Sequence, residues 1–187
     1  MKSTQQKTVT NGVDVPKLFE TINAIKDNQN IAKFKFMAKN KWTLGGQNHT
    51  SVNEFYGACK THSREQPFVF VKDEPPILLG NDEGANPVEY ALAALAGCLT
   101  TSLVYHASAR GVKIDEIEST LEGNLDLRGF LGMSDEIRNG YENIRVNFKI
   151  KSDVPTSELE KLVDLAKKRS PVFDIISNPT PVNVTLS

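Results

Sequence analysis

The sequence predicts a single α+β domain organised around one helix, from about Pro87 to Ala109, with Cys98 near its middle. Three observations lead to this prediction. A long run rich in Ala and Leu begins at Asn86-Pro87, segments with apolar residues at every second position flank it, and an amphipathic run follows near the C-terminus. A chain of 187 residues can bury a core without disulfides or metals.

The charge balance and the hydropathy pattern exclude several classes of protein. The 22 basic and 23 acidic residues give a net charge of −1, which offers no general basic field for nucleic acid or an anionic membrane. The longest apolar stretch, Val88 to Leu99, is shorter than the roughly 20 residues that span a bilayer. The polar N-terminus lacks a secretory signal, and two cysteines form no disulfide framework. We therefore expect a cytoplasmic protein without nucleic-acid or membrane partners.

The N-terminal 31 residues are expected to form an extension to the main domain. Met1–Val13 is polar and predicts no regular structure. Val15–Asn30 has apolar residues at helical spacing, and Pro16 suits the first turn of a helix. We predict a polar tail and an amphipathic helix over residues 1–31, followed by the main domain over residues 32–187.

Strands are predicted between this extension and the central helix. Ala32–Tyr56 is typical of two long strands joined by a hairpin at Gly45-Gly46. Glu65–Phe70 is rich in β-forming residues and predicts another strand. The turn residues of Lys72–Asp82 predict a loop that crosses toward the helix, and its Pro-rich part could act as a lid.

The central helix has clear start and stop signals. Asn86 can accept a hydrogen bond from a free amide of the first turn, and Pro87 needs no donor at the first position. The sequence is apolar on nearly every face as far as Leu103, which predicts a helix buried on all sides. Gly111 is expected to end the helix.

The C-terminal half alternates strands and helices. Its two long strands are predicted from alternating apolar residues, and its helices from the Pro residues and charges at their ends. A closing strand, with Pro179 just before it and Pro181 within it, is expected at the edge of a sheet. These elements are the strands Val112–Leu127 and Tyr141–Lys151, the connection Arg128–Gly140, the helices Pro155–Arg169 and Pro171–Ile176, and the closing strand Thr180–Leu186.

Cys98 is the first candidate for chemistry. A cysteine among Ala, Gly and Leu is either a small buried hydrophobic residue or a nucleophile, depending on its exposure and pKa. Cys59 is interpreted as a surface thiol. His106 lies eight residues beyond Cys98, about 12 Å along the helix, too far to act as its base within one chain.

No metal-binding spacing and no phosphate-binding Gly-rich loop occurs, so no metal and no cofactor is predicted.

The segments Gly84–Tyr90 and Ala93–Cys98 resemble the OsmC/Ohr family. Its members have an Asn-Pro-Glu helix start and a peroxidatic cysteine twelve residues after the Asn, the separation of Asn86 and Cys98 here. The resemblance extends from about Ala32 to the C-terminus. It implies an OsmC-like fold, with antiparallel sheets wrapped around two central helices in an intertwined homodimer, and active sites at the subunit interface.

The resemblance implies thiol-dependent reduction of organic hydroperoxides, with Cys98 as the residue that attacks the peroxide. In the family, a second cysteine then forms a disulfide with the first, and an external dithiol reduces it. An Arg and a Glu keep the first cysteine ionised and orient the peroxide.

Several positions depart from this pattern. Val88 stands where the family has its catalytic Glu, and Glu89 is rotated about 100° around the helix from that position. Ser170 replaces the second cysteine and cannot form a disulfide. The stretch comparable to the one that supplies the family's Arg, Lys39–Thr50, contains no Arg, although Lys39 and Lys41 could contribute charge. The chain therefore resembles a divergent branch of the family.

Three functions remain open at this point. The first is a thiol peroxidase for defence against oxidative or osmotic stress, which uses Cys98 alone and an external thiol reductant. The second is a non-peroxidase that binds a small apolar ligand in the pocket at the dimer interface, made less polar by Val88. The third is a structural stress protein in which Cys98 only packs.

Overall fold

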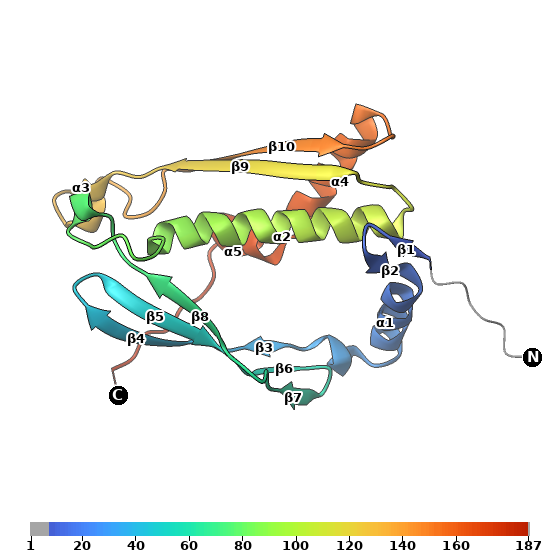
Figure 1. The fold of residues 1–187 in the computed structure, drawn as a ribbon, viewed down its shortest axis with the longest axis horizontal. Coiled ribbons are helices and arrows are strands. Elements are labelled where there is room, and N and C mark those ends of the chain that lie inside the picture. The colour runs from blue at the N-terminus through green and yellow to red at the C-terminus, as the bar shows by residue number, and fades with distance from the viewer. Residues whose placement is uncertain (1–7, 187) are drawn as a thin grey trace, which may run out of the picture. The chain divides into compact units, whose positions relative to one another are not determined.

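The computed structural model, which describes residues 8–186, contains five α-helices and four small antiparallel sheets. Figure 1 shows these elements, coloured from blue near the N-terminus to red near the C-terminus. The described residues divide into two units, one formed by residues 8–15 and 92–186 and the other by Pro16–Ala91. The mixture of helices and antiparallel sheets confirms the predicted α+β class. The boundary expected at residue 31 stays a prediction.

A short hairpin lies where no regular structure was expected. Strands β1 (Val9–Thr10) and β2 (Val13–Asp14) pair across a turn at Asn11-Gly12. Both turn residues have positive φ, +51° for Asn11 and +79° for Gly12, which is the backbone that tight hairpin turns require. The expectation for Met1–Val13 is therefore wrong for residues 9–13, and its residues 1–7 lie outside the described part.

The N-terminal helix α1 spans Val15–Asp27 and confirms the helix predicted over Val15–Asn30, with an earlier end. The side chain of Asn28 accepts a hydrogen bond from the amide of Asn30 at 3.1 Å. This bond begins the 3-10 turn η1 (Gln29–Ala32) in place of further α-helix.

The predicted Gly45-Gly46 hairpin is confirmed, but its two long strands are broken into four. Strand β4 pairs with β5 across Gly45-Gly46, and β3 pairs with β6 farther along the same two segments. The breaks at Met37-Ala38 and Asn53-Glu54 divide the pairing into two sheets, ordered β3-β6-β7 and β4-β5-β8. The strands are β3 (Lys35–Phe36), β4 (Lys39–Leu44), β5 (Gln47–Val52), β6 (Phe55–Gly57), β7 (Lys60–His62) and β8 (Phe68–Lys72).

Strand β7 was not predicted, because its turn lacks the usual residues. Ala58 and Cys59 both have positive φ, +48° and +62°, at the two positions where Asn or Gly is preferred. Strand β8 begins three residues later than the predicted Glu65–Phe70 and ends at Lys72. After it, the predicted loop contains the single 3-10 turn η2 (Pro76–Leu78).

The central helix α2 spans Pro87–Ala109, as predicted. Gly111, two residues after its end, has a left-handed φ of +71°. The amide of Gly111 donates to the carbonyl of Ser108 at 3.0 Å, and that of Val112 donates to Ala107 at 2.9 Å. These two bonds are the Schellman arrangement that satisfies the last free carbonyls of a helix.

The prediction that this helix is buried on all sides is wrong for the single chain. Its buried residues are Leu95, Leu99, Leu103, Ala107 and Ser108, which follow one face. A second face is exposed, at Ala93, Gly97, Thr101 and Tyr105. By length and composition alone, α2 could also cross a membrane, contrary to the length argument above, although core helices of soluble proteins pass the same test.

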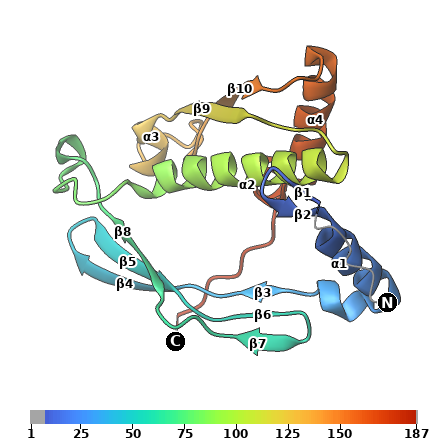
Figure 2. The same ribbon diagram turned by 45° about the vertical axis from the view of Figure 1, so that its right-hand side comes forward.

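Strands β9 (Glu116–Asn124) and β10 (Asn143–Lys151) form a long antiparallel hairpin. Figures 1 and 2 show this hairpin running along α2. Every second residue of both strands faces inward, as the alternation predicted. The core beneath the hairpin joins α2 to α4 (Thr156–Arg169) through Leu103, Ala107, Leu162 and Ala166.

The remaining elements follow the prediction except at two places. The connection after β9 contains the short helix α3 (Leu127–Phe130), and α5 (Pro171–Ser177) follows α4 as expected. The predicted closing strand Thr180–Leu186 is wrong, because no strand forms there. Its alternating Val182, Val184 and Leu186 are exposed, so this segment finds no partner strand within the described chain.

Candidate functional site

The first turn of α2 is fixed by two reciprocal hydrogen bonds. The amide of Glu89 donates to Asn86 Oδ1 at 2.9 Å, which confirms the predicted cap. The amide of Asn86 donates to Glu89 Oε2 at 2.8 Å. This capping box satisfies two free donors and gives the Glu89 carboxylate a structural use. The capping box fixes where the helix begins, and Cys98 lies twelve residues after the Asn86 cap.

Cys98 is a free thiol that is partly exposed. It lies between the buried Leu95 and Leu99 on one side and the exposed Gly97 on the other. A Cβ placed on Gly97 would meet no atom within 4 Å, so the surface beside the thiol is open in the single chain. Within residues 8–186, the thiol has no hydrogen-bond or ion-pair partner. Cys98 is therefore accessible to a small reactant.

Val88 and Glu89 lie at the beginning of α2, ten and nine residues before Cys98. At 1.5 Å per residue, Val88 is about 15 Å from Cys98 along the axis. Val88 is half-buried and brings no charge. Lys39 and Lys41, the cations expected from the early strand, are exposed on β4 opposite Ser51 and His49.

Ser170 is buried, with 2% of its surface exposed, between α4 and α5. Its Oγ accepts a hydrogen bond from the amide of Phe173 at 3.2 Å and so caps α5. Its own amide donates to the carbonyl of Ala166 at 2.8 Å. Ser170 thus joins two helices, a role that serine performs at least as well as cysteine.

Cys59, the thiol other than Cys98, is exposed on the β6–β7 turn.

A cluster of polar contacts around Lys72, which the sequence did not reveal, lies beside the start of α2. The Lys72 ammonium donates to Thr50 Oγ1 and lies 5.8 Å from the centre of the Tyr90 ring. The Tyr90 hydroxyl donates to the carbonyl of Val71 at 2.8 Å. Burial lowers the pKa of Lys72 from its ordinary value of 10.5. The cluster depends on the pairing of β5 with β8, which no local signal predicts.

His106 lies two turns beyond Cys98, within the same helix. Burial lowers the pKa of its imidazole, and the nearby cations Arg110 and Arg169 lower it further. The neutral form is therefore favoured at neutral pH. Among residues 8–186, no group of three or more His, Cys, Asp or Glu side chains is placed to hold a metal ion.

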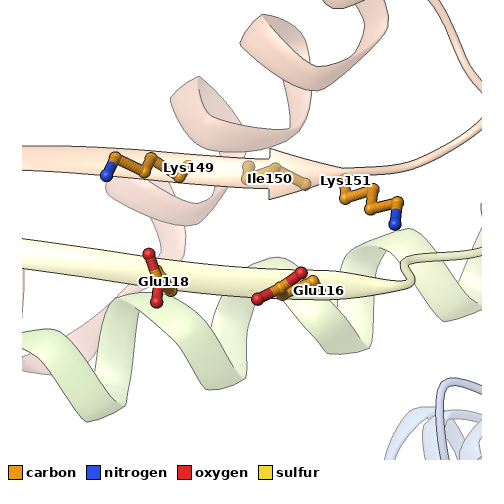
Figure 3. Close-up of a pocket in the computed structure, with 5 residues that line it drawn as sticks. All are labelled: Glu116, Glu118, Lys149, Ile150 and Lys151. Atoms are coloured by element: carbon orange, nitrogen blue, oxygen red, sulfur yellow. The ribbon is translucent and has the colours of Figure 1, made fainter.

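Two surface pockets lie elsewhere, and neither is lined by Cys98. The first, of about 200 Å³, lies on the outer face of the β9–β10 hairpin (Figure 3). In it, Glu116 lies opposite Lys151 and Glu118 opposite Lys149 across the two strands. Opposite charges that face each other across two strands stabilise a sheet, and here the two carboxylates are matched in number by two ammonium groups. The second pocket lies between β10 and α4.

Solved structures with this fold come from several bacteria. An OsmC-like protein of Mycoplasma pneumoniae is 17% identical, with a TM-score of 0.59 over 76% of this chain and 87% of that one. An organic hydroperoxide resistance protein of Legionella pneumophila is 19% identical, with a TM-score of 0.51 over 76% of this chain and 88% of that one. One of Elizabethkingia anophelis is 19% identical, with a TM-score of 0.53 over 75% and 86%. At these identities, the likeness shows the fold alone.

No curated protein matches the sequence. A family model described as OsmC-like protein matches residues 80–185, more than half of the chain. The match includes the Asn86 cap, the helix that carries Cys98, the β9–β10 hairpin and both C-terminal helices. The structures from M. pneumoniae and L. pneumophila are both named as OsmC proteins, and together with the family model they confirm the resemblance and the predicted fold. This chain belongs to the family of OsmC-like proteins.

Proposed function

We propose that the protein is a thiol-dependent peroxidase that reduces organic hydroperoxides with Cys98. The observation that carries the proposal is an accessible free thiol on the central helix, twelve residues after the Asn that caps it. The names of two structural relatives, which refer to organic hydroperoxide resistance, support it.

The reaction needs two steps. The Cys98 thiolate attacks the distal oxygen of the hydroperoxide, a sulfur–oxygen bond forms, the oxygen–oxygen bond breaks, and the alcohol leaves with a proton. The sulfur is oxidised to a sulfenic acid while the hydroperoxide is reduced. A small dithiol then reduces the sulfenic acid: it first forms a mixed disulfide with Cys98 and releases water, and its second thiol frees Cys98.

An external reductant is required because the chain offers no second thiol at the family position. Ser170 stands there and is engaged as the cap of α5. A serine hydroxyl cannot condense with a sulfenic acid to form a disulfide. The oxidised Cys98 is therefore open to external thiols, or to overoxidation when they are scarce.

The first test compares three proteins in a steady-state assay with cumene hydroperoxide and dithiothreitol. We expect Cys98→Ser to lose about a hundredfold or more of the peroxidase rate, because a hydroxyl is a far weaker nucleophile than a thiolate. The control Cys59→Ser should keep the wild-type rate. Mass spectrometry should find a dimedone adduct on Cys98 after peroxide treatment. Equal rates for the wild type and Cys98→Ser would refute the proposal.

A second function is favoured by the lack of a free carboxylate at the start of α2. Val88 replaces the expected Glu, and the Glu89 carboxylate is held by the Asn86 amide. The alternative is a protein that binds a small apolar ligand beside α2 without turnover. In that case native mass spectrometry would show the same retained ligand in the wild type and in Cys98→Ser, and the peroxidase assay would show no dependence on Cys98.

We also propose that the protein acts as a homodimer. The exposed face of α2 supports this assembly, since the small residues Ala93, Gly97 and Thr101 and the large Tyr105 follow one another on it at four-residue spacing. The exposed alternating side chains of residues 182–186 are a second unpartnered surface. A partner subunit could cover both surfaces and enclose the Cys98 site.

A further inference from the structure

A groove of about 560 Å³ lies between β10 and α4, within one unit of the chain. Its volume falls in the range of small-molecule sites. The floor is apolar and formed by partly buried side chains, which include Val146, Phe148, Leu159 and Val163. Figure 1 locates both elements, and neither carries Cys98. The groove is therefore separate from the proposed peroxidase site.

Two carboxylates line the same groove. Glu160 and Asp164 are exposed and lie one turn apart on α4. Like charges at this spacing destabilise a helix unless a cation compensates them. Lys161, which directly follows Glu160, pairs instead with Glu158 at 2.6 Å. Within residues 8–186, neither Glu160 nor Asp164 has an ion-pair or hydrogen-bond partner.

No basic side chain lines the groove, so the two carboxylates are the charged groups beside its apolar floor. A hydrocarbon chain would gain by leaving water for the floor. A cationic head group would be attracted to the carboxylates, whereas an anionic one would be repelled. An uncharged alkyl compound would gain only the apolar contribution. The charge and the apolar lining therefore select one class of ligand.

We propose that the groove between β10 and α4 binds an amphipathic cation, an alkylamine whose ammonium group lies between Glu160 and Asp164 and whose chain lies on Phe148 and Val163. Binding is driven by apolar burial, and the carboxylates supply the preference for a positive head. Because surface ion pairs are screened by salt, the preference for amines should weaken as the ionic strength rises.

The experiment measures binding of three ten-carbon compounds to the full-length protein by titration calorimetry below their micelle concentrations. These are decylammonium, decanol and decanoate. We expect decylammonium to bind about tenfold more tightly than decanol, and decanoate to show no binding. The double variant Glu160→Gln/Asp164→Asn should bind decylammonium about tenfold more weakly than the wild type and leave decanol unchanged. Circular dichroism should confirm that this surface variant folds.

A matched control removes the same two charges elsewhere. Asp135→Asn/Glu136→Gln lies in the exposed connection before β10 and should bind decylammonium like the wild type. Cys98→Ser should also bind like the wild type, which separates this proposal from the peroxidase. Equal binding of decylammonium and decanol would overturn the proposal. An equal loss of affinity in both double variants would also overturn it, because it would show a general effect of net charge.

Discussion

At the scale of single residues, Asp73 holds the loop between β8 and α2. Its side chain is 1% exposed, and its carboxylate accepts hydrogen bonds from the amides of Glu74 at 2.8 Å, Asn81 at 3.1 Å and Glu83 at 3.3 Å. The loop is closed so tightly that a Cβ on Gly80 would lie 1.8 Å from the carbonyl oxygen of Glu74. Only glycine fits there, and the segment considered as a lid is tied down by one side chain.

These bonds make the loop sensitive to pH. Burial alone would raise the pKa of Asp73, but the three amides favour the carboxylate and lower the pKa below its ordinary value of 3.8. The group therefore stabilises the fold above its unfolded pKa and loses that contribution as the pH falls through the lower, folded value. Asp73→Asn should lower the urea midpoint at pH 6 and flatten its dependence on pH between 6 and 3.

Urea titrations at several pH values, with the exposed Asp82→Asn of the same loop as the control, test this prediction. An NMR titration of the Asn81 and Glu83 amides should give a midpoint below 3.8. The prediction fails if that midpoint is at or above the ordinary value, or if both variants keep the wild-type dependence on pH.

At the scale of elements, the β1–β2 hairpin is joined to the end of α2 through Asn11. Asn11 Nδ2 donates to the carbonyl of Val112 at 2.9 Å and to Ser108 Oγ at 3.2 Å, and its Oδ1 accepts from the amide of Ile114 at 2.8 Å. Ser108 is buried and also lies 3.0 Å from the carbonyl oxygen of Thr10. One side chain thus connects the hairpin, the helix end and the approach to β9.

Removal of this side chain should destabilise the protein by about 2 to 3 kcal/mol, since partly buried groups would lose their partners. Asn11→Gly keeps the positive φ of the turn and isolates the loss of the three bonds. Asn11→Ala should cost roughly 1 kcal/mol more, because alanine is strained in the left-handed region. Chemical denaturation of both variants gives the values. A free energy of unfolding for Asn11→Gly within about 0.5 kcal/mol of the wild type would contradict the prediction.

At the scale of the whole molecule, the single chain leaves apolar surface uncovered. The α2 face that contains Gly97 and Tyr105 is exposed, with Tyr105 at 48% of its surface. Large side chains such as Trp42, Phe36 and Phe68 are exposed on the strands of the other unit. Monomeric proteins rarely expose so many large apolar side chains, so a second copy of the chain is the expected cover.

Light scattering at micromolar concentration should give a mass of about twice 20.7 kDa. Gly97→Lys should shift the mass toward one chain, because the open space at Gly97 accepts a side chain in the monomer but would place a charge in the α2 interface. Thr120→Lys, on the exposed face of β9, should leave the dimer intact. A monomeric mass for the wild type would refute the assembly.

The sequence by itself determined the elements whose signals are local. The span of α2, its Asn86 cap, its Gly111 stop and the alternation of β9 and β10 depend on neighbouring residues, and all agree with the structure. One local signal was overlooked: Asn11-Gly12 is a strong turn dipeptide, but the strands beside it are short and partly polar.

Only the tertiary structure decided which partners distant residues find. Thr180–Leu186 has the pattern of a strand and forms none, because pairing needs a second strand that no pattern within the segment can supply. The Asn11 contacts with Ser108 and Ile114 span about a hundred residues, and the groove between β10 and α4 exists only where two separate elements meet. Local preferences determine elements, whereas burial and pairing between distant segments determine sites.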